Sequence, residues 1–218
     1  MALKMPITNS IQVLYNPDLI DLWFILPAII GMILQSQAVV LAAMTIVRER
    51  EAGTVEQILA TPIRPFELIL GKLIPLLFLG VLMIAIVLGL GTFWFGVPFR
   101  GSLWLYLWLA LLFIASSLGL GLLVSAISRN QKETQQISQM LMLFSMLLTG
   151  LIYPRNAMPV IPQFIGDLIP LTYFIRISRG IITKGVGLTF FWSDALVLLF
   201  YALVLMFVAS FSFKNRLD

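Results

Sequence analysis

Charged and polar side chains gather in one short stretch of the sequence, between residues 48 and 67. Arg48–Glu51 alternate in charge directly after a long apolar run. Gly53 permits a turn, and Thr54 stands where a helix N-cap belongs, with Gln57 three residues further on in the capping-box pattern. The pattern predicts a short helix over 55–60. A charged, capped helix of this kind offers contacts to another protein.

Two prolines make this stretch stiff. Pro62 and Pro65 end the short helix and restrict the backbone that leads back into apolar sequence. A flexible linker would need neither a cap nor two prolines. We therefore interpret 48–68 as a compact element between two apolar segments. It could transmit force from a soluble partner, or it could be a connector that only orients the two segments, and these residues alone leave both open.

The residue types and motifs that the sequence lacks exclude several kinds of site. The 218 residues include no Cys and no His, which excludes disulfides, thiolate or imidazole metal sites, and His-dependent nucleophilic catalysis. An intramembrane enzyme is therefore the least favoured hypothesis. No basic stripe with interleaved aromatic residues is present to bind nucleic acid, and no GxxxxGK(S/T) loop is present to bind ATP.

Hydrophobic residues make up 60% of the chain and charged residues 11%, against about 45–50% and about 25% in ordinary globular proteins. A bilayer core needs roughly 20 apolar helical residues per span. The predicted fold is an all-α integral membrane protein with about five transmembrane helices, a short cytoplasmic helix and a re-entrant outer helical hairpin. The spans are predicted near 22–47, 69–95, 103–127, 137–153 and 190–213, all within a transmembrane domain over 22–218.

Residues 154–184 do not read as a lipid-exposed span. They contain four prolines, and broken backbone bonds or charges are costly in lipid. Two short amphipathic helices joined by a break at Pro170 fit better, as a hairpin that dips into the interface. The charged residues of this stretch include Arg155, Asp167, Arg176 and Arg179.

Short loops favour placing 48–68 in the cytoplasm. The loop with Arg129 and Lys132 would then also lie inside, while the loop with Arg100 would lie outside, in keeping with the positive-inside rule. Residues 1–21 would lie outside, which is unexpected for a chain without a signal peptide and suggests a missing upstream helix.

The run REREAGTVEQILATPIRPFELILGKLIP resembles the signature region of permease subunits in the type-2 ABC exporter family. The order of spans is similar over essentially the whole chain. The resemblance implies a first transmembrane helix and an extracytoplasmic domain that this chain is expected to lack, with 1–21 as a remnant. The residues that match are Arg48, Glu49, Arg50, Glu51, Gly53, Thr54, Glu56, Gln57, Leu59, Thr61, Pro62, Glu67, Gly71, Lys72 and Pro75.

In that family the short cytoplasmic helix is a coupling helix that docks in a groove of a separate ATPase subunit. The resemblance therefore implies a multi-pass inner-membrane exporter subunit that is not itself an enzyme and has no cofactor of its own. ATP and Mg would bind the partner ATPase, and a second permease copy or paralogue would complete a dimer. The expected coupling residues are Arg48, Glu49, Arg50, Glu51, Gly53, Thr54, Glu56, Gln57, Pro62, Arg64 and Glu67.

Polar residues within the spans are weaker candidates for the translocation path, because polar groups at membrane depth carry an energetic cost. The simpler explanation for any one of them is hydrogen bonding between helices. The alternative function is a secondary transporter or channel subunit without an ATPase, which would typically have ionisable groups at the midplane; the clear spans show none. The candidate path residues are Gln35, Ser36, Gln37, Ser116 and Ser117.

Overall fold

The computed structural model describes residues 21–53, 65–153 and 155–214, and within these ranges the chain forms helices and no strand. The all-α prediction is confirmed for this part of the protein. The helices are α1 (Asp21–Glu51), α3 (Pro65–Gly89), the π-helix η1 (Leu90–Trp94), α4 (Leu103–Ile127), α5 (Gln131–Leu148), the 3₁₀-helix η2 (Arg155–Ala157), α6 (Val160–Asp167), α7 (Pro170–Arg179), the π-helix η3 (Gly180–Lys184) and α8 (Leu188–Lys214).

Four of these helical segments are long and apolar enough to cross a membrane: Trp23–Glu51, Gly71–Trp94, Leu103–Ile127 and Leu188–Leu205. Val160–Asp167 and Pro170–Lys184 meet this test only as a pair, and they are bent by 87° at the break between them. The protein is therefore a multi-pass membrane protein. The range predicted to form a re-entrant hairpin is occupied by this bent pair.

Helix α5 begins and ends earlier than the span predicted near 137–153. The side chain of Asn130 accepts the backbone N–H of Glu133 at 2.8 Å, and the Glu133 carboxylate accepts the backbone N–H of Arg129 at 2.7 Å. These caps begin the helix among polar residues that an apolar run does not include. Gly150, at a φ of +85°, follows its last turn.

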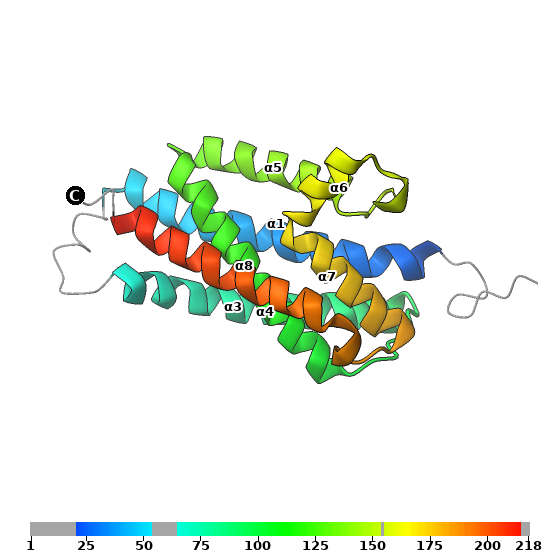
Figure 1. Ribbon diagram of the computed structural model, residues 1–218. Coiled ribbons are helices and arrows are strands. Elements are labelled where there is room, and N and C mark those ends of the chain that lie inside the picture. The colour runs from blue at the N-terminus through cyan, green and yellow to red at the C-terminus, as the bar shows by residue number, and fades with distance from the viewer. Residues whose placement is uncertain (1–20, 54–64, 154, 215–218) are drawn as a thin grey trace, which may run out of the picture.

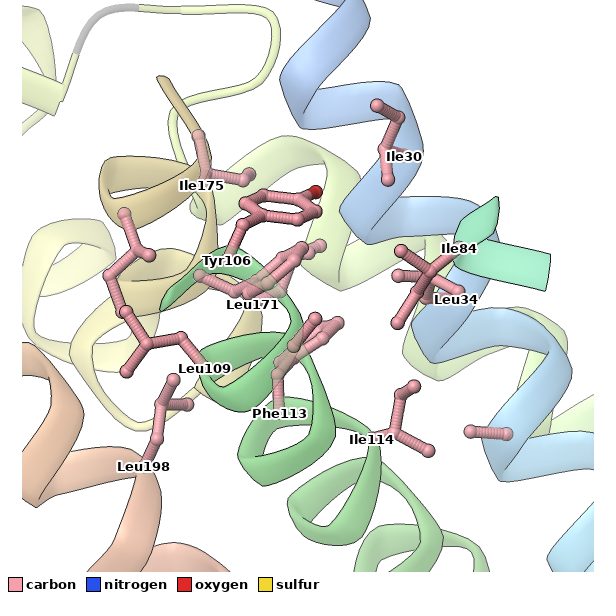
Figure 2. Packing of buried hydrophobic residues seen from close by; sticks show 14 of the residues in the cluster. Ile30, Leu34, Ile84, Tyr106, Leu109, Phe113, Ile114, Leu171, Ile175 and Leu198 are labelled. Atoms are coloured by element: carbon pink, nitrogen blue, oxygen red, sulfur yellow. The ribbon is translucent and has the colours of Figure 1, made fainter. Parts of the chain in front are cut away.

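Helix α4 lies at the centre of the bundle and packs against α1, α3, α7 and α8 (Figure 1). The largest buried side chains come from these helices and meet around α4 (Figure 2). The rings of Phe113 and Phe174 stack with centroids 4.2 Å apart, and the buried hydroxyl of Tyr106 lies 3.1 Å from that of Ser178. Helix α7 is thus held in the core although it belongs to the bent pair.

Two glycines let the helices approach closely. A Cβ atom at Gly121 would lie 2.5 Å from the carbonyl oxygen of Val39 in α1, and one at Gly119 would lie 2.5 Å from the Cβ of Leu205 in α8. Small residues at such crossings are typical of membrane helix packing. A Cβ atom added at Gly89 would have nothing within 4 Å, so this glycine does not mark a close helix contact.

The bundle has two ends. At one end α1, α4 and α8 finish and α3 and α5 begin; we call this the Glu51 end (left in Figure 1). At the opposite end α1 and α4 begin and α5 is followed by the bent pair; we call this the hairpin end. The predicted coupling segment starts at the Glu51 end.

Candidate functional site

Arg50, in the last turn of α1, caps the end of α4. Its Nη1 donates to the carbonyl oxygen of Ser125 at 3.4 Å, and its Nη2 donates to the carbonyl oxygen of Ser128. The last carbonyls of a helix have no partner within the helix and carry the negative end of its dipole. A guanidinium from a neighbouring helix satisfies both requirements, so Arg50 fastens α1 to α4.

Glu51 caps the beginning of the next helix. Its Oε1 accepts the backbone N–H of Gln131 at 2.9 Å, and its Oε2 accepts the side-chain amide of the same residue. The first N–H groups of a helix are unpaired and lie at the positive end of the dipole, where a carboxylate is favourable. Two consecutive residues of α1 therefore hold the end of α4 and the start of α5.

A third contact joins α1 to α3. Lys72 forms an ion pair and hydrogen bond with the Oε2 of Glu49, and both side chains are partly buried. The last turn of α1 is thereby attached to α3, α4 and α5. These residues, at the entrance to the predicted coupling segment, form the candidate functional site.

The other predicted coupling residues fall into two groups. Arg48, Gly53 and Glu67 are exposed, and Gly53 adopts a φ of +69° that favours glycine. The predicted coupling helix itself lies outside the described residues, as do Thr54, Glu56, Gln57, Pro62 and Arg64. Their role stays a prediction.

Gln35 of α1 faces α5. Its Nε2 donates to the Oγ of Ser145 at 3.0 Å, and it is almost fully buried. Its Oε1 and the buried Oγ of Ser138 have no hydrogen-bond partner within the described part of the chain. Both residues line a small pocket between α1 and α5, together with Ser36. This seam therefore brings buried polar side chains of α1 and α5 together.

The remaining path candidates lie elsewhere. The Ser116 hydroxyl contacts the carbonyl oxygens of Leu112 and, across the helix pair, Leu198 at 3.0 Å, and the Ser117 hydroxyl donates to Phe113. Interhelical and intrahelical hydrogen bonding thus accounts for both serines. Gln37 is exposed beside α3. The structure does not bring the five candidates together.

Sequence reasoning missed three residues that the structure places in these contacts: Gln131, Ser138 and Ser145. Ser138 and Ser145 are seven positions apart in α5, which places them on one helical face. That spacing was available as a signal. The partner of Gln131 could not be predicted, because Glu51 is 80 residues away in the sequence.

Comparison with known proteins identifies the family. The family model for the ABC-2 family transporter protein matches residues 3–211. This chain belongs to the ABC-2 transporter family. It is 34% identical to the "probable multidrug ABC transporter permease YbhS" of Escherichia coli (strain K12) over 205 residues, which cover 94% of the chain and 54% of that relative.

Two further relatives of this ABC-2 family chain extend the comparison. The "inner membrane transport permease YhhJ" of Escherichia coli (strain K12) is 31% identical over 191 residues, 85% of the chain and 50% of the relative. The "ABC transporter G family member 20" of Dictyostelium discoideum is 25% identical over 214 residues, 97% of the chain and 29% of the relative. The chain spans about half the length of its bacterial relatives.

Proposed function

We propose that this chain is the transmembrane subunit of an ATP-driven exporter and is coupled through residues 48–68 to a separate ATPase subunit. The observation that carries the proposal is the three-way attachment of the last turn of α1 to α3, α4 and α5. Family membership supports it, because relatives are described as ABC transporter permeases.

Through this attachment, a force on the coupling segment can be passed from α1 to other helices. A partner that pushes on 52–64 displaces the last turn of α1, and Arg50 and Glu51 pass that displacement to the ends of α4 and α5. Packed helices shift as rigid elements, so a small movement at one end can change the packing of the whole bundle.

ATP and Mg would be held by the partner, since the sequence contains no phosphate-binding loop. The translocation path would run along the α1–α5 seam around Gln35 and be completed by a second permease copy or paralogue. A buried amide oxygen without a partner is costly in a membrane interior, which favours a role over a purely structural one.

The test uses the full-length protein in proteoliposomes with the ABC ATPase that co-purifies with it. Replacing 54–60 by a Gly-Ser segment of equal length should abolish both the stimulation of ATP hydrolysis and ATP-dependent export. The control replaces the exposed Arg100 in the loop at the other end by Gln, and should leave both intact. Export driven by an ion gradient, with no ATPase present, would show that the chain is a secondary transporter instead.

A further inference from the structure

A cavity of about 440 Å³ opens at the hairpin end, between the start of α1, the end of α5, and the bent pair. Its volume is within the range of about 300–1,000 Å³ found for small-molecule sites. Apolar side chains such as Phe24 and Ile175 form part of its wall. The polar part of the wall contains three guanidinium groups and includes Arg155, Asn156, Gln163, Asp167, Arg176 and Arg179.

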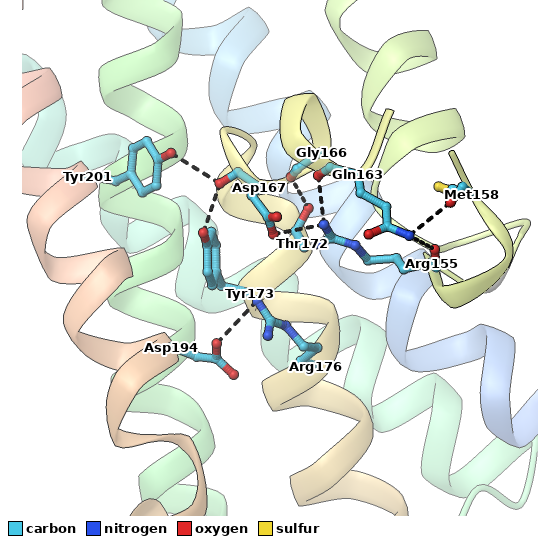
Figure 3. Close-up of polar contacts among 10 residues, drawn as sticks. All are labelled: Arg155, Met158, Gln163, Gly166, Asp167, Thr172, Tyr173, Arg176, Asp194 and Tyr201. Carbon is cyan, nitrogen blue, oxygen red and sulfur yellow. Dashed lines mark hydrogen bonds and ion pairs between the residues drawn. The ribbon is translucent and has the colours of Figure 1, made fainter. Parts of the chain in front are cut away.

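The first of the three arginines has a carboxylate partner. Arg155 Nη2 lies 2.8 Å from Asp167 Oδ1 and 2.8 Å from the carbonyl oxygen of Gln163 (Figure 3). The Gln163 amide in turn donates to the carbonyl oxygens of Arg155 and Met158, each at 2.9 Å. This ring of contacts holds one wall of the cavity in place and balances its charge.

The charge of the second arginine, Arg176, is balanced by a carboxylate that does not line the cavity. Arg176 Nη2 lies 3.3 Å from Oδ1 of Asp194 in α8, and its guanidinium lies 4.9 Å from the centre of the Tyr173 ring (Figure 3). Its side chain is half exposed, whereas that of Asp194 is nearly buried. Arg176 therefore contributes a hydrogen-bond donor but no net charge.

Arg179 differs from both. Its Nε donates to the carbonyl oxygen of Phe24 at 3.1 Å, and Nη1 and Nη2 both lie 3.3 Å from the carbonyl oxygen of Gly150. The guanidinium also lies 3.7 Å from the centre of the Phe24 ring. Within the described residues, no carboxylate forms an ion pair with it. Neutral oxygens and a ring orient the group but do not cancel its charge.

The guanidinium has five N–H groups. Three of them point to carbonyl oxygens, so one remains on each terminal nitrogen. The end-on pair of parallel N–H groups is already shared by the Gly150 carbonyl oxygen, so the two N–H groups that remain diverge, and each can donate one hydrogen bond to a phosphate or carboxylate oxygen. A partly buried cation without a counter-ion is unfavourable, and an anion in the cavity would remove that penalty.

We propose that this cavity binds an oxyanion of the phosphate class, with Arg179 as the main cationic contact. The ligand is either the headgroup of an anionic phospholipid or free phosphate. The apolar wall at Phe24 and Ile175 suits a headgroup that carries acyl chains. The proposal stands on the cavity and on Arg179 alone and does not depend on the exporter function.

The test measures binding to the full-length protein in neutral detergent by calorimetry. One arm uses short-chain phosphatidylglycerol and the other inorganic phosphate, with short-chain phosphatidylcholine as the uncharged reference. The wild type should bind one of the two anionic ligands at a single site and bind phosphatidylcholine more weakly. Arg179→Gln should weaken anion binding about tenfold, as expected for a charge-assisted contact.

Two further variants keep the result interpretable. Arg100→Gln removes the same charge from an exposed residue of the neighbouring loop, outside the cavity, and should bind as the wild type does. Asn156→Asp adds a negative charge to an exposed position on the cavity wall and should weaken anion binding severalfold, even if Arg179→Gln fails to fold.

The two arms identify the source of the anion. Saturable binding of inorganic phosphate that requires Arg179 assigns the site to free phosphate, whereas binding of phosphatidylglycerol alone assigns it to a lipid headgroup. The proposal is overturned if neither ligand binds, if Arg179→Gln or a folded Asn156→Asp binds as tightly as the wild type, or if Arg100→Gln loses as much affinity as Arg179→Gln.

Discussion

Arg50 and Arg179 make the same kind of contact at opposite ends of the bundle. Each donates to backbone carbonyl oxygens of other elements: Ser125 and Ser128 for Arg50, and Phe24 and Gly150 for Arg179. The surroundings differ. Acidic residues flank Arg50 in sequence and form contacts of their own with α3 and α5, whereas Arg179 borders a cavity.

The comparison shows how one contact can serve two purposes. At the Glu51 end, Glu49, Arg50 and Glu51 form contacts that join helices, so the end is suited to transmitting force. At the hairpin end, the described residues orient the charge of Arg179 with neutral groups alone, which leaves it available to a ligand. Substitutions at the first end should therefore affect stability and coupling, and substitutions at the second should affect binding.

The largest effect is expected for Arg50→Ala. Hydrogen bonds to a charged group are worth about 1.5–3 kcal/mol, and the variant leaves α4 carbonyls without their cap. We expect a loss of about 2 kcal/mol in the free energy of unfolding, measured by thermal melting in detergent. The stimulation of a bound ATPase should fall together with the free energy of unfolding.

Arg48→Ala is the matched control for Arg50→Ala. Arg48 is the neighbouring arginine of the same helix end and is exposed. Exposed substitutions away from special contacts usually stay within about 0.5 kcal/mol. Equal melting temperatures for the two variants would show that the cap on α4 is not what stabilises this end.

Gly150→Ala is the corresponding test at the hairpin end. Gly150 has a φ of +85°, and a left-handed backbone costs a residue with a Cβ about 1–2 kcal/mol. The added Cβ would also lie 2.9 Å from Cγ of Arg155. We expect a lower melting temperature together with weaker anion binding, because the Gly150 carbonyl oxygen helps to orient Arg179.

Gly187→Ala serves as its control, since nothing lies within 4 Å of a Cβ at that position. It should change neither the melting temperature nor the affinity appreciably. If Gly150→Ala lowers stability but leaves anion affinity unchanged, the Gly150 carbonyl does not position the guanidinium.

The sequence predicted the local features of both ends and missed the distant ones. Apolar runs predicted the third span over 103–127, and prolines predicted a broken pair after residue 154. Local hydrogen bonds, such as those around Asn130, shifted the start of α5 into polar sequence. The Arg50 contacts join residues more than 70 positions apart, and no periodicity reports on such a pairing.

A smaller effect is expected at Glu51, whose contact is exposed. A side-chain oxygen at a helix N-terminus stabilises the helix as a hydrogen-bond acceptor, and a negative charge contributes separately through the helix dipole. Glu51→Ala should therefore lower the melting temperature by more than Glu51→Gln, which keeps an acceptor oxygen but loses the charge. Thermal melting at low and high salt distinguishes the two contributions, because only the charge term is screened. A Gln variant as unstable as the Ala variant would exclude a hydrogen-bonded cap.

The smallest stability change, and the sharpest contrast, is expected for Asp167→Asn at the hairpin end. The Arg155–Asp167 pair is partly exposed, and such pairs contribute only about 0–1 kcal/mol. The Tyr173 and Tyr201 hydroxyls contact the Asp167 carbonyl oxygen, so they keep their partner in the variant. Removing the carboxylate leaves the Arg155 charge unbalanced beside the cavity, and phosphatidylglycerol or phosphate should then bind severalfold more tightly.

Removing an acidic side chain should thus have opposite consequences at the two ends. Glu51→Gln loses stability because its carboxylate holds a helix start, whereas Asp167→Asn gains anion affinity because its carboxylate competes with the ligand for Arg155. Calorimetry on Asp167→Asn, with Arg100→Gln as the charge control, checks the sign. Unchanged or weaker anion binding in Asp167→Asn would mean that the ligand does not approach Arg155, and would restrict the site to the part of the cavity around Arg179.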